Sequence, residues 1–415
     1  MLTYREHLLE AYKNLNQRKR KTEPGECQTA HEQRCTLCHA IDYTYEQELK
    51  AKNLALQVFW KKSNLPGAPD PIIPSPRERK YRNISRRKAF RVDGKVRLAL
   101  TDVDESPYSA FRPLDIERCQ IETDEHTNIY EEIQKLLEKP FSFAAATALN
   151  YVVIKGSYRE HSIIFSVSAY NPTVSKAVSR LSKLLIEGND NVTAFYLFID
   201  EGASLTALLA AENDSSKFKR LYGKKEIPEL IAGKMNYLSS LAFPHYNFST
   251  LDFVYKKVEE LLAPSRFDKL IDVYCGYGLF TIGFAERVNN VAAIDPDDIV
   301  IDLAKLNMLK MKFLNCVIVK NEVNDSTLKR LCKASTGPEI VILSPPKGAS
   351  TRGLVEFFAP RNVRKILYLC HDIDVLPTEL ARWHKKNFLP SKIICYDVLP
   401  GLYGIEAIVL LERKK

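Results

Sequence analysis

Two glycines and an acid mark a part of this sequence that could bind a small molecule. Asp272-Val-Tyr-Cys-Gly-Tyr-Gly278 follows an apolar run, and Gly276 and Gly278 allow the backbone to turn sharply and approach a ligand closely. The next apolar run ends in Asp295, an acid that suits the two hydroxyl groups of a ribose. These residues are therefore candidate cofactor ligands. A strand-turn-helix joint with a solvent-facing acid is the alternative interpretation.

Both a dinucleotide and S-adenosylmethionine fit this pattern. The dinucleotide signature G-x-G-x-x-G requires a third glycine at position 281, where this sequence has Thr281. The pattern therefore favours S-adenosylmethionine.

A third apolar run ends in Ser344-Pro345-Pro346. The turn is rigid because proline fixes φ and lacks an N–H, so neighbouring carbonyl groups can face a substrate. Many nucleic-acid methyltransferases carry an Asp/Asn/Ser-Pro-Pro turn at this place, and a purely structural turn is the alternative.

Two further side chains could catalyse a reaction. Cys370 ends the run KILYLC, where a thiolate could act as a nucleophile with help from His371, although such a cysteine is more commonly a core residue. Glu406 lies inside the apolar run GIEAIVLL, and burial would raise its pKa toward that of a usable base. An edge-strand position facing water is the alternative for Glu406.

The cysteines are unevenly distributed. An odd count of 9 in a chain of 415 residues does not indicate a disulfide scaffold, so free or metal-ligating thiols are expected. Cys27, Cys35 and Cys38 lie close together, whereas Cys119 stands alone. This grouping is typical of a ligand set.

The candidate site residues from Asp272 onward lie on an alternating series of strands and helices that begins near Lys234. This alternation predicts a mostly parallel sheet with helices on both faces and a ligand site beyond the carboxyl ends of the strands. The expected strands are Lys269–Tyr274, Val291–Asp295, Cys316–Lys320, Glu339–Ser344, Lys365–Cys370, Lys392–Asp397 and Glu406–Glu412.

The preceding part of the chain has a different pattern. A short amphipathic helix, the cysteine group and a helix over Tyr45–Lys61 come first, and a stiff proline-rich linker follows. The central part mixes expected strands (Lys95–Thr101, Tyr151–Ile154, Ser162–Ser168 and Ala194–Ile199) with expected helices (His126–Glu138 and Val174–Glu187). We therefore expect three regions, residues 1–76, 77–235 and 236–415.

Composition limits the class of protein. With 45% hydrophobic residues the chain is expected to fold into packed domains, which excludes a disordered or fibrous protein. No apolar run approaches the roughly 20 residues of a membrane-spanning helix, and the amino-terminal segment is charged throughout. We expect a cytoplasmic monomer without a membrane partner.

Several of these motifs occur in an order that resembles the RNA uracil-5-methyltransferase family, whose members methylate C5 of uridine in ribosomal and transfer RNA. The resemblance covers about residues 27–120 and 236–415. The similar segments are Cys27-x7-Cys35-x2-Cys38 with the following helix, Tyr81-Arg-Asn83, Phe243-Pro-His-Tyr-Asn247, Asp272–Gly278, Ser344-Pro-Pro-Lys347 and Gly404-Ile-Glu406.

The resemblance implies an α/β protein with a C-terminal class I (Rossmann-like) methyltransferase domain, a smaller α+β central RNA-binding domain and an N-terminal iron–sulfur loop. It implies that Tyr274 and Asp295 hold S-adenosylmethionine, with His245 and Ser344 making polar contacts in the pocket. Cys119 falls where the fourth ligand of a [4Fe–4S] cluster is expected, beside Cys27, Cys35 and Cys38. Four thiolates also suit zinc, but a single C-x-x-C pair favours the cluster.

The implied reaction forms 5-methyluridine through a covalent adduct. The Cys370 thiolate adds to C6 of uracil, the resulting enolate takes the methyl group, and Glu406 removes the C5 proton. This chain departs from the family near the reacting centre. It has Leu369-Cys370-His371-Asp372 in place of Ser-Cys-Asn-Pro, with Tyr368 one residue nearer the cysteine, and His245, Ser344 and Asp295 in place of Gln, Asp and Glu.

The expected partner is RNA, 23S ribosomal RNA before transfer RNA. The net charge is +9, and the basic clusters Arg18–Lys21 and Arg77–Arg91 would contact phosphates while Tyr81 and Phe90 stack on bases. A solvated charged face is the alternative for both clusters. Two other functions remain open: a diverged RNA-binding relative without catalysis, and an RNA methyltransferase that acts on another atom through Ser344-Pro-Pro.

Overall fold

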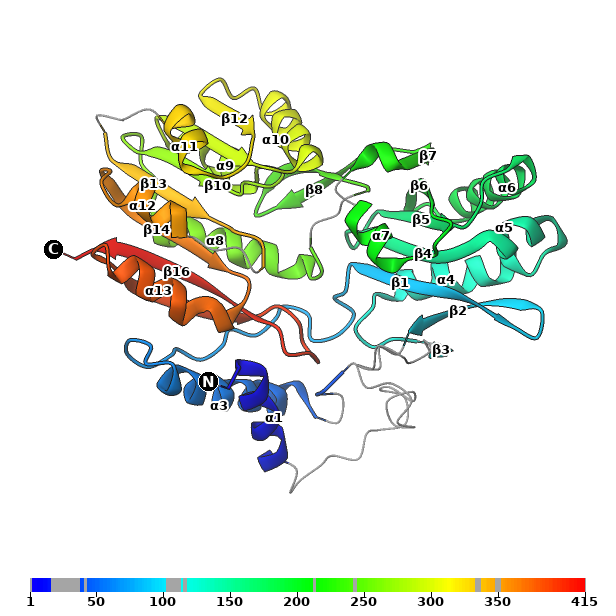
Figure 1. Cartoon of the computed structure of the whole chain (residues 1–415), viewed down its shortest axis with the longest axis horizontal. Helices are drawn as coiled ribbons and strands as arrows, with labels where there is room; N and C mark the ends of the chain where they lie inside the picture. Colours follow the sequence, from blue (N-terminus) through cyan, green and yellow to red (C-terminus); the bar gives the residue numbers. More distant parts are fainter. Residues whose placement is uncertain are drawn as a thin grey trace.

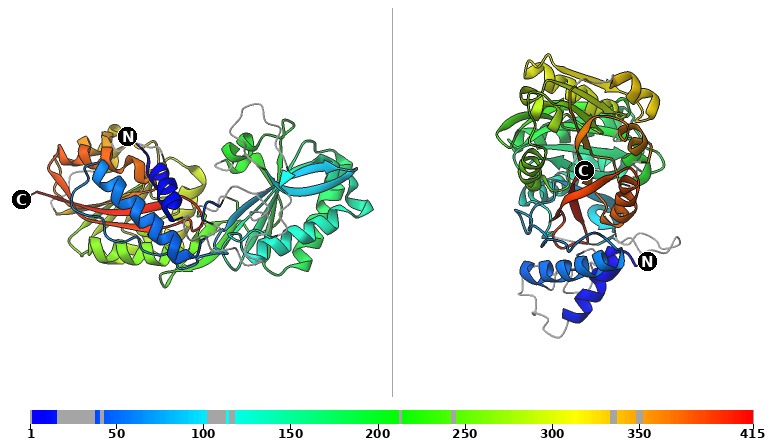
Figure 2. Two further views of the ribbon diagram at one scale, coloured as in Figure 1. Left: turned by 90° about the horizontal axis from the view of Figure 1, so that it is seen from below. Right: turned by 90° about the vertical axis from the view of Figure 1, so that its left-hand side faces the viewer.

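The computed structural model describes residues 2–15, 38–40, 43–101, 113–114, 118–211, 214–241, 245–332, 337–347 and 352–414. These residues form two seven-stranded sheets that lie side by side, and the amino-terminal helices pack beneath the carboxyl-terminal sheet (Figure 1). Two perpendicular views confirm that these helices lie against the carboxyl-terminal half of the chain (Figure 2). None of the described helices is long and apolar enough to cross a membrane.

The carboxyl-terminal sheet confirms the predicted strand series. Its order is β12-β11-β10-β13-β14-β16-β15, and the pairs among the first five strands are parallel while β16 runs antiparallel to both neighbours. Its strands are β10 (Lys269–Val273), β11 (Asn290–Asp295), β12 (Cys316–Lys320), β13 (Glu339–Leu343), β14 (Val363–Cys370), β15 (Phe388–Asp397) and β16 (Ile405–Arg413). β15 begins earlier than predicted, at Phe388. The strand tolerates Pro390 because its pairing with β16 shifts register between Pro390 and Lys392.

Helices cover both faces of this sheet, as the alternation predicts. One face packs on α8 (Leu251–Leu262), α9 (Leu279–Phe284) and α10 (Asp298–Lys310), and the other on α11 (Asp325–Leu331), α12 (Arg352–Phe358) and α13 (Leu376–His384). Alternate residues of each strand enter opposite cores, because successive side chains of a strand point to opposite faces. Leu369 is in the α8 core, whereas Tyr368 and Cys370 are in the α13 core.

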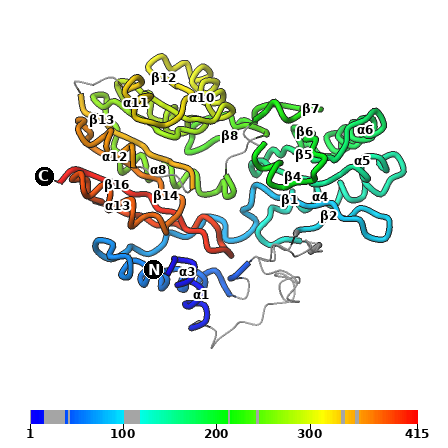
Figure 3. Tube along the Cα trace, viewed as in Figure 1, coloured from blue at the N-terminus to red at the C-terminus, as the bar shows by residue number. Residues whose placement is uncertain are grey.

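The central sheet is mixed and has the order β3-β2-β1-β4-β5-β6-β7. Its strands are β1 (Ile84–Val92), β2 (Lys95–Thr101), β3 (Pro113–Leu114), β4 (Leu149–Gly156), β5 (His161–Val167), β6 (Val192–Ile199) and β7 (Phe218–Gly223). The helices α4 (Asp124–Leu137), α5 (Phe143–Ala148) and α6 (Pro172–Gly188) share its main core, and α7 (Leu205–Ala211) packs on the other face. The hairpin β8 (Glu226–Ile231) and β9 (Lys234–Ser239) then carries the chain back to the carboxyl-terminal half (Figure 3).

Strand β1 is missing from the sequence prediction because its charged residues resemble a solvated basic run. Arg87 points into the protein, where its guanidinium group forms a bidentate ion pair with buried Glu122, and it is 5% exposed. The Arg91 guanidinium group donates to the carbonyl groups of Ala146 and Thr147 at the end of α5. The prediction that this run contacts phosphates is therefore wrong for Arg87, because its guanidinium group pairs with Glu122 inside the domain.

The amino-terminal helices α1 (Tyr4–Leu15) and α3 (Tyr45–Lys62) share a core with the carboxyl-terminal sheet. The proline-rich linker also joins this sheet: Ile73 pairs with β15, donating to the Cys395 carbonyl and accepting from Asp397 N–H. The basic cluster Arg18–Lys21 lies outside the described residues. The linker is therefore a packed part of the carboxyl-terminal half.

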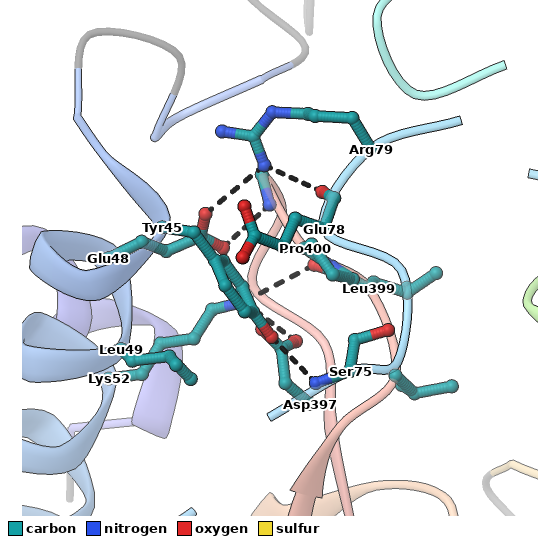
Figure 4. A network of polar contacts seen from close by, with 12 residues as sticks. Tyr45, Glu48, Leu49, Lys52, Ser75, Glu78, Arg79, Asp397, Leu399 and Pro400 are labelled. Carbon is teal, nitrogen blue, oxygen red and sulfur yellow. Dashed lines mark hydrogen bonds and ion pairs between the residues drawn. The ribbon is translucent and has the colours of Figure 1, made fainter. Parts of the chain in front are cut away.

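A buried network of charges fixes α3 to the loop between β15 and β16 (Figure 4). The Lys52 ammonium group lies 2.7 Å from Glu48 Oε1 and 2.8 Å from Asp397 Oδ1, and all three side chains are fully buried. Lys52 also donates to the Leu399 carbonyl, and Glu48 accepts from the Gly401 N–H. Buried charges of this kind are tolerated only when they are paired and hydrogen-bonded.

We expect acid to destabilise the central sheet through His161. Its ring is fully buried, neither ring nitrogen has a hydrogen-bond partner among the described residues, and burial lowers its pKa to about 4. The unfolded chain binds a proton near pH 6.5, so stability falls as the pH drops from 6.5 toward 4, by about 2 kcal/mol at pH 5. Urea unfolding of wild type and of His161→Phe at pH 7 and pH 5 measures this loss. Hydrogen exchange of the β4–β6 amides shows whether the loss is in the central sheet.

The matched control is His384→Phe, because His384 is exposed on α13. His161→Phe should lose less stability on acidification than wild type, whereas His384→Phe should behave as wild type does. Equal acid sensitivity in wild type and His161→Phe would contradict the assignment to His161.

Candidate active site

A cavity of about 450 Å³ lies at the carboxyl ends of β10, β13 and β14. Side chains from β15, β16 and the start of α8 also line it. Of the residues singled out from the sequence, the cavity brings together His245, Tyr274, Gly276, Ser344, His371 and Glu406. Asp295 touches the cavity loop from behind, and Cys370 is not among the lining residues.

The loop after β10 has the left-handed backbone that its glycines allow. Gly276 has φ 55° and Gly278 has φ 86°, and Tyr274 also has a positive φ of 61°. A Cβ atom added to Gly276 would meet no atom within 4 Å, so open space lies directly against the backbone there. A Cβ atom on Gly278 would come within 3.3 Å of the Ala304 side chain, so this glycine allows α9 and α10 to pack closely.

Asp295 ends β11 and holds this loop. Its Oδ2 atom accepts from the Gly276 N–H at 2.9 Å and its Oδ1 atom accepts from the Asp297 N–H at 3.0 Å. Burial raises the pKa of Asp295, and these two backbone hydrogen bonds act against the shift. A carboxylate anchored in this way is fixed in direction beside the open space at Gly276.

Thr281, noted in the sequence only as a missing glycine, has a partner in the structure. Its hydroxyl group donates to Asp272 Oδ2 at 2.6 Å, and burial raises the pKa of Asp272 to about 7. The sequence does not reveal this pair, because the two residues are separated by a turn whose geometry only the fold defines. The pair ties β10 to α9 behind the loop.

Ser344, His371 and Glu406 form a continuous chain of hydrogen bonds on the cavity wall. The Ser344 Oγ atom lies 3.1 Å from His371 Nε2, and His371 Nδ1 lies 3.1 Å from Glu406 Oε2. The Tyr396 hydroxyl group also donates to Glu406. The carboxyl ends of β13 and β14 and the start of β16 therefore position the three groups side by side.

The charges of these groups support one another. Burial alone would raise the pKa of Glu406. The nearby His371 ring outweighs this effect and lowers the Glu406 pKa. In return, burial opposes protonation of His371, but the Glu406 carboxylate outweighs it and raises the His371 pKa. A carboxylate only accepts hydrogen bonds, so His371 donates from Nδ1 and, when neutral, presents its Nε2 lone pair to Ser344.

Cys370 has a different environment from the one predicted for a nucleophile. It is 1% exposed, its thiol donates to the Asp372 carbonyl, and burial raises its pKa to about 12. Its side chain enters the α13 core because it shares a face with Tyr368, while His371 enters the cavity. Nucleophilic attack by Cys370 stays a prediction that the described conformation does not favour.

His245 and Asn247 come from one motif and have separate functions. His245 Nε2 lies 3.2 Å from the Tyr277 hydroxyl group, and burial lowers its pKa to about 4, so the ring is neutral at pH 7. The Asn247 amide donates to Ser75 and to the Val398 carbonyl, and its neighbour Tyr246 accepts from the Asn83 N–H. Asn247 therefore joins the linker, the central sheet and the cavity, a contact set that the sequence alone does not reveal.

The predicted metal ligands are only partly described. Cys27 and Cys35 lie outside the described residues, and within the described ranges no group of three or more His, Cys, Asp or Glu side chains could hold a metal ion. Cys38 and Cys119 are both partly buried, and burial raises the Cys119 pKa to about 11. Their segments reach the same region, because Ala40 N–H donates to the Gly401 carbonyl and a Cβ atom added to Gly401 would lie 3.6 Å from the Ile121 side chain, two residues after Cys119.

Comparison with known proteins gives relatives over most of the chain. An uncharacterized RNA methyltransferase of Nanoarchaeum equitans is 24% identical over 394 residues, which are 93% of this chain and 80% of that protein. The uncharacterized RNA methyltransferase YljE of Lactococcus lactis is 21% identical over 266 residues, 64% of this chain. The chain spans 56% of the length of YljE.

A solved structure and a family model give further matches. The structure of Pyrococcus abyssi tRNA (uracil-54, C5)-methyltransferase with S-adenosyl-L-homocysteine has a TM-score of 0.65 at 18% identity, covering 90% of this chain and 85% of that one. This likeness concerns the fold. Residues 267–352 match the family model of RNA cap guanine-N2 methyltransferase.

Together, the Rossmann-like fold and these matches support an S-adenosylmethionine-dependent RNA methyltransferase. Both relatives carry the name RNA methyltransferase, in agreement with the class of enzyme that the sequence motifs indicate.

We expect Asp295→Ala to weaken cofactor binding about 10- to 100-fold, since a hydrogen bond to a charged group contributes roughly 1.5–3 kcal/mol. The variant also removes the anchor of the Gly276 N–H. Isothermal titration with S-adenosylmethionine measures the change, and Asp298→Ala, at an exposed position on α10, is the control. Equal affinities in the two variants would exclude Asp295 from the cofactor site.

Proposed function

We propose that this chain transfers a methyl group from S-adenosylmethionine to a base of RNA, with uridine as the base that the family resemblance implies. The observation that carries the proposal is the convergence of three features on one cavity: the glycine loop with Asp295, the Ser344-Pro-Pro turn and the His371–Glu406 pair. A cavity of about 450 Å³ is within the usual range for small-molecule sites.

The residues present fit the cofactor. The open space against Gly276 admits a ligand to the backbone, and Asp295 lies directly behind it with a buried carboxylate. Tyr274 lines the same wall, so Tyr274, Gly276 and Asp295 would hold the adenosine part. When bound, S-adenosylmethionine supplies a methyl group on a positively charged sulfur, which an electron-rich atom of the substrate can attack.

The substrate base must leave its stack to reach this cavity. Tyr246, Tyr277, Phe280 and Tyr396 line it and provide flat apolar surfaces for a base. A loop or another unpaired region of RNA costs less to unstack than a helix, so we propose a single-stranded site in 23S ribosomal RNA or transfer RNA.

Formation of 5-methyluridine through a Cys370 adduct is the second candidate. Glu406, the base that this route requires, lines the cavity, and Cys370 immediately precedes His371. This route requires the Cys370 thiol to leave the α13 core and lose a proton despite its raised pKa.

The test is mass spectrometry of nucleosides from RNA of cells with and without this protein. Loss of one methylated nucleoside at a mapped position would identify the substrate, and the purified protein should restore it with deuteriomethyl S-adenosylmethionine. Because residues 267–352 also match a guanine-N2 family model, every methylated nucleoside is measured. No difference in any of them would favour a diverged RNA-binding relative.

We also propose a cytoplasmic protein in which Cys27, Cys35, Cys38 and Cys119 hold a [4Fe–4S] cluster. Anaerobic purification tests the cluster, because Cys-ligated clusters absorb broadly near ~400 nm. If the purified protein contains zinc without iron, the four cysteines hold zinc and not a cluster.

A further inference from the structure

We infer that Ser344, His371 and Glu406 form a proton relay that removes a proton from a nitrogen atom of the acceptor base, so that the product is an N-methylated nucleoside. This inference rests on the proposed function and names the atom class on which it acts. No sequence motif indicates the relay, because Ser344 follows β13, His371 follows β14 and Glu406 lies in β16, so the three residues meet only in the folded protein.

The geometry of the relay defines a base. Glu406 Oε2 lies 3.1 Å from His371 Nδ1, and the same oxygen accepts from the Tyr396 hydroxyl group. The Nε2 lone pair of His371 then faces the cavity beside the Ser344 hydroxyl group at 3.1 Å. The imidazole is 32% exposed and the carboxylate 20%, so a substrate can reach the ring while its partner stays behind it.

The same three residue types occur in serine hydrolases, but the residues that follow Ser344 cannot supply the N–H donor that such a reaction commonly uses. A nucleophilic serine requires backbone N–H groups aimed at the oxyanion, commonly including that of the following residue. Pro345 and Pro346 follow Ser344 and have no N–H. The Ser344 hydroxyl therefore serves to pass or orient a proton, and His371 is the final acceptor.

The lone pair of the acceptor nitrogen forms a new bond to the methyl carbon, and the bond from that carbon to the sulfonium sulfur breaks with its electron pair remaining on sulfur. The proton of the nitrogen moves to His371 Nε2 through the Ser344 hydroxyl group. Glu406 stabilises the imidazolium that forms, and release of this proton to water restores the neutral ring.

Methylation at C5 would need a different arrangement. A proton on C5 of uracil becomes removable only after a nucleophile has added at C6, and the cavity lining includes His371 but not Cys370. Cys370 faces the opposite core, one residue earlier along β14. A nitrogen acceptor needs no adduct, because its proton can be taken directly by a neighbouring base.

The experiment uses the full chain, deuteriomethyl S-adenosylmethionine and RNA from cells that lack the protein. We expect the label on a base nitrogen, with His371→Asn slowing methylation about 100- to 10,000-fold and Cys370→Ala retaining at least a third of the wild-type rate. Two readouts are independent of activity. His371→Asn should bind S-adenosylmethionine as wild type does, and nitrogen NMR should show the His371 pKa falling in Glu406→Gln.

Some outcomes would overturn the inference, and others would overturn its premise. Labelled 5-methyluridine, or a Cys370→Ala variant that is inactive while His371→Asn is active, would remove the relay but leave the RNA methyltransferase function intact. A His371 pKa that does not respond to Glu406→Gln would also remove the relay. Failure of the wild-type chain to bind S-adenosylmethionine or to label any nucleoside would overturn the proposed function itself.

Discussion

Replacing Glu406 by glutamine should lower the rate of RNA methylation about 100- to 10,000-fold, because the base His371 loses the carboxylate that orients it and stabilises its protonated form. The substitution keeps the size of the side chain but removes the charge that holds His371 Nδ1–H at 3.1 Å. A neutral amide can present either its oxygen or its nitrogen to the ring, so the tautomer of His371 is no longer fixed. Single-turnover assays with labelled cofactor measure the loss.

The pH dependence shows whether the loss acts through His371. Only neutral His371 accepts a proton, so wild-type activity declines as the pH falls through the His371 pKa, which Glu406 raises. Without the carboxylate this pKa drops, and the decline in Glu406→Gln should move to lower pH. Glu412→Gln, farther along β16, is the control. An unchanged profile in Glu406→Gln would mean that Glu406 acts by itself.

Replacing Lys52 by methionine should lower the free energy of unfolding of the carboxyl-terminal half by about 3–5 kcal/mol, as expected when one member of a buried charge network is removed. The change leaves two fully buried carboxylates, Glu48 and Asp397, without their common counter-ion. Methionine fills a similar volume, so the loss reports charge rather than a cavity. The network also holds Leu399, whose backbone carbonyl accepts from Lys52 and whose side chain lines the active-site cavity.

The two tryptophans make this loss measurable. Trp60 lies in α3 and Trp383 in α13, both buried in the core that contains the amino-terminal helices. Fluorescence during urea unfolding therefore follows the affected half. Lys50→Met is the control, because Lys50 is exposed on the same helix. A change of less than 1 kcal/mol in Lys52→Met would show that solvent or a rearranged partner compensates the two carboxylates.

The sequence alone determined the alternating strand and helix architecture of the carboxyl-terminal half. Its central strands are buried on both faces, so they appear as short continuous apolar runs, and the helices between them impose a parallel sheet. One of these runs ends at Asp295, and two others are followed by Gly276 and Ser344, so the place of these residues at one edge of the sheet follows from the parallel strands. The seven strands match the prediction, with differences confined to their ends.

The prediction that the Arg77–Arg91 cluster contacts phosphates is wrong for Arg87, and the reason is physical. A run of arginines has the same composition whether it faces RNA or a buried acid. Arg87 is buried because Glu122, far along the chain, lies next to it once β1 pairs with β2 and β4. That contact depends on tertiary packing, which the local pattern does not contain.

Only the tertiary structure decided which residue of the Cys370-His371 pair faces the cavity. Neighbouring residues of a strand point to opposite faces, so a shift of one position exchanges core and site. The pairing of Cys370 with Ala407 in β16 sets this register, and it places His371 between Ser344 and Glu406. The sequence determined the residues available for catalysis, and strand register determined which of them meet.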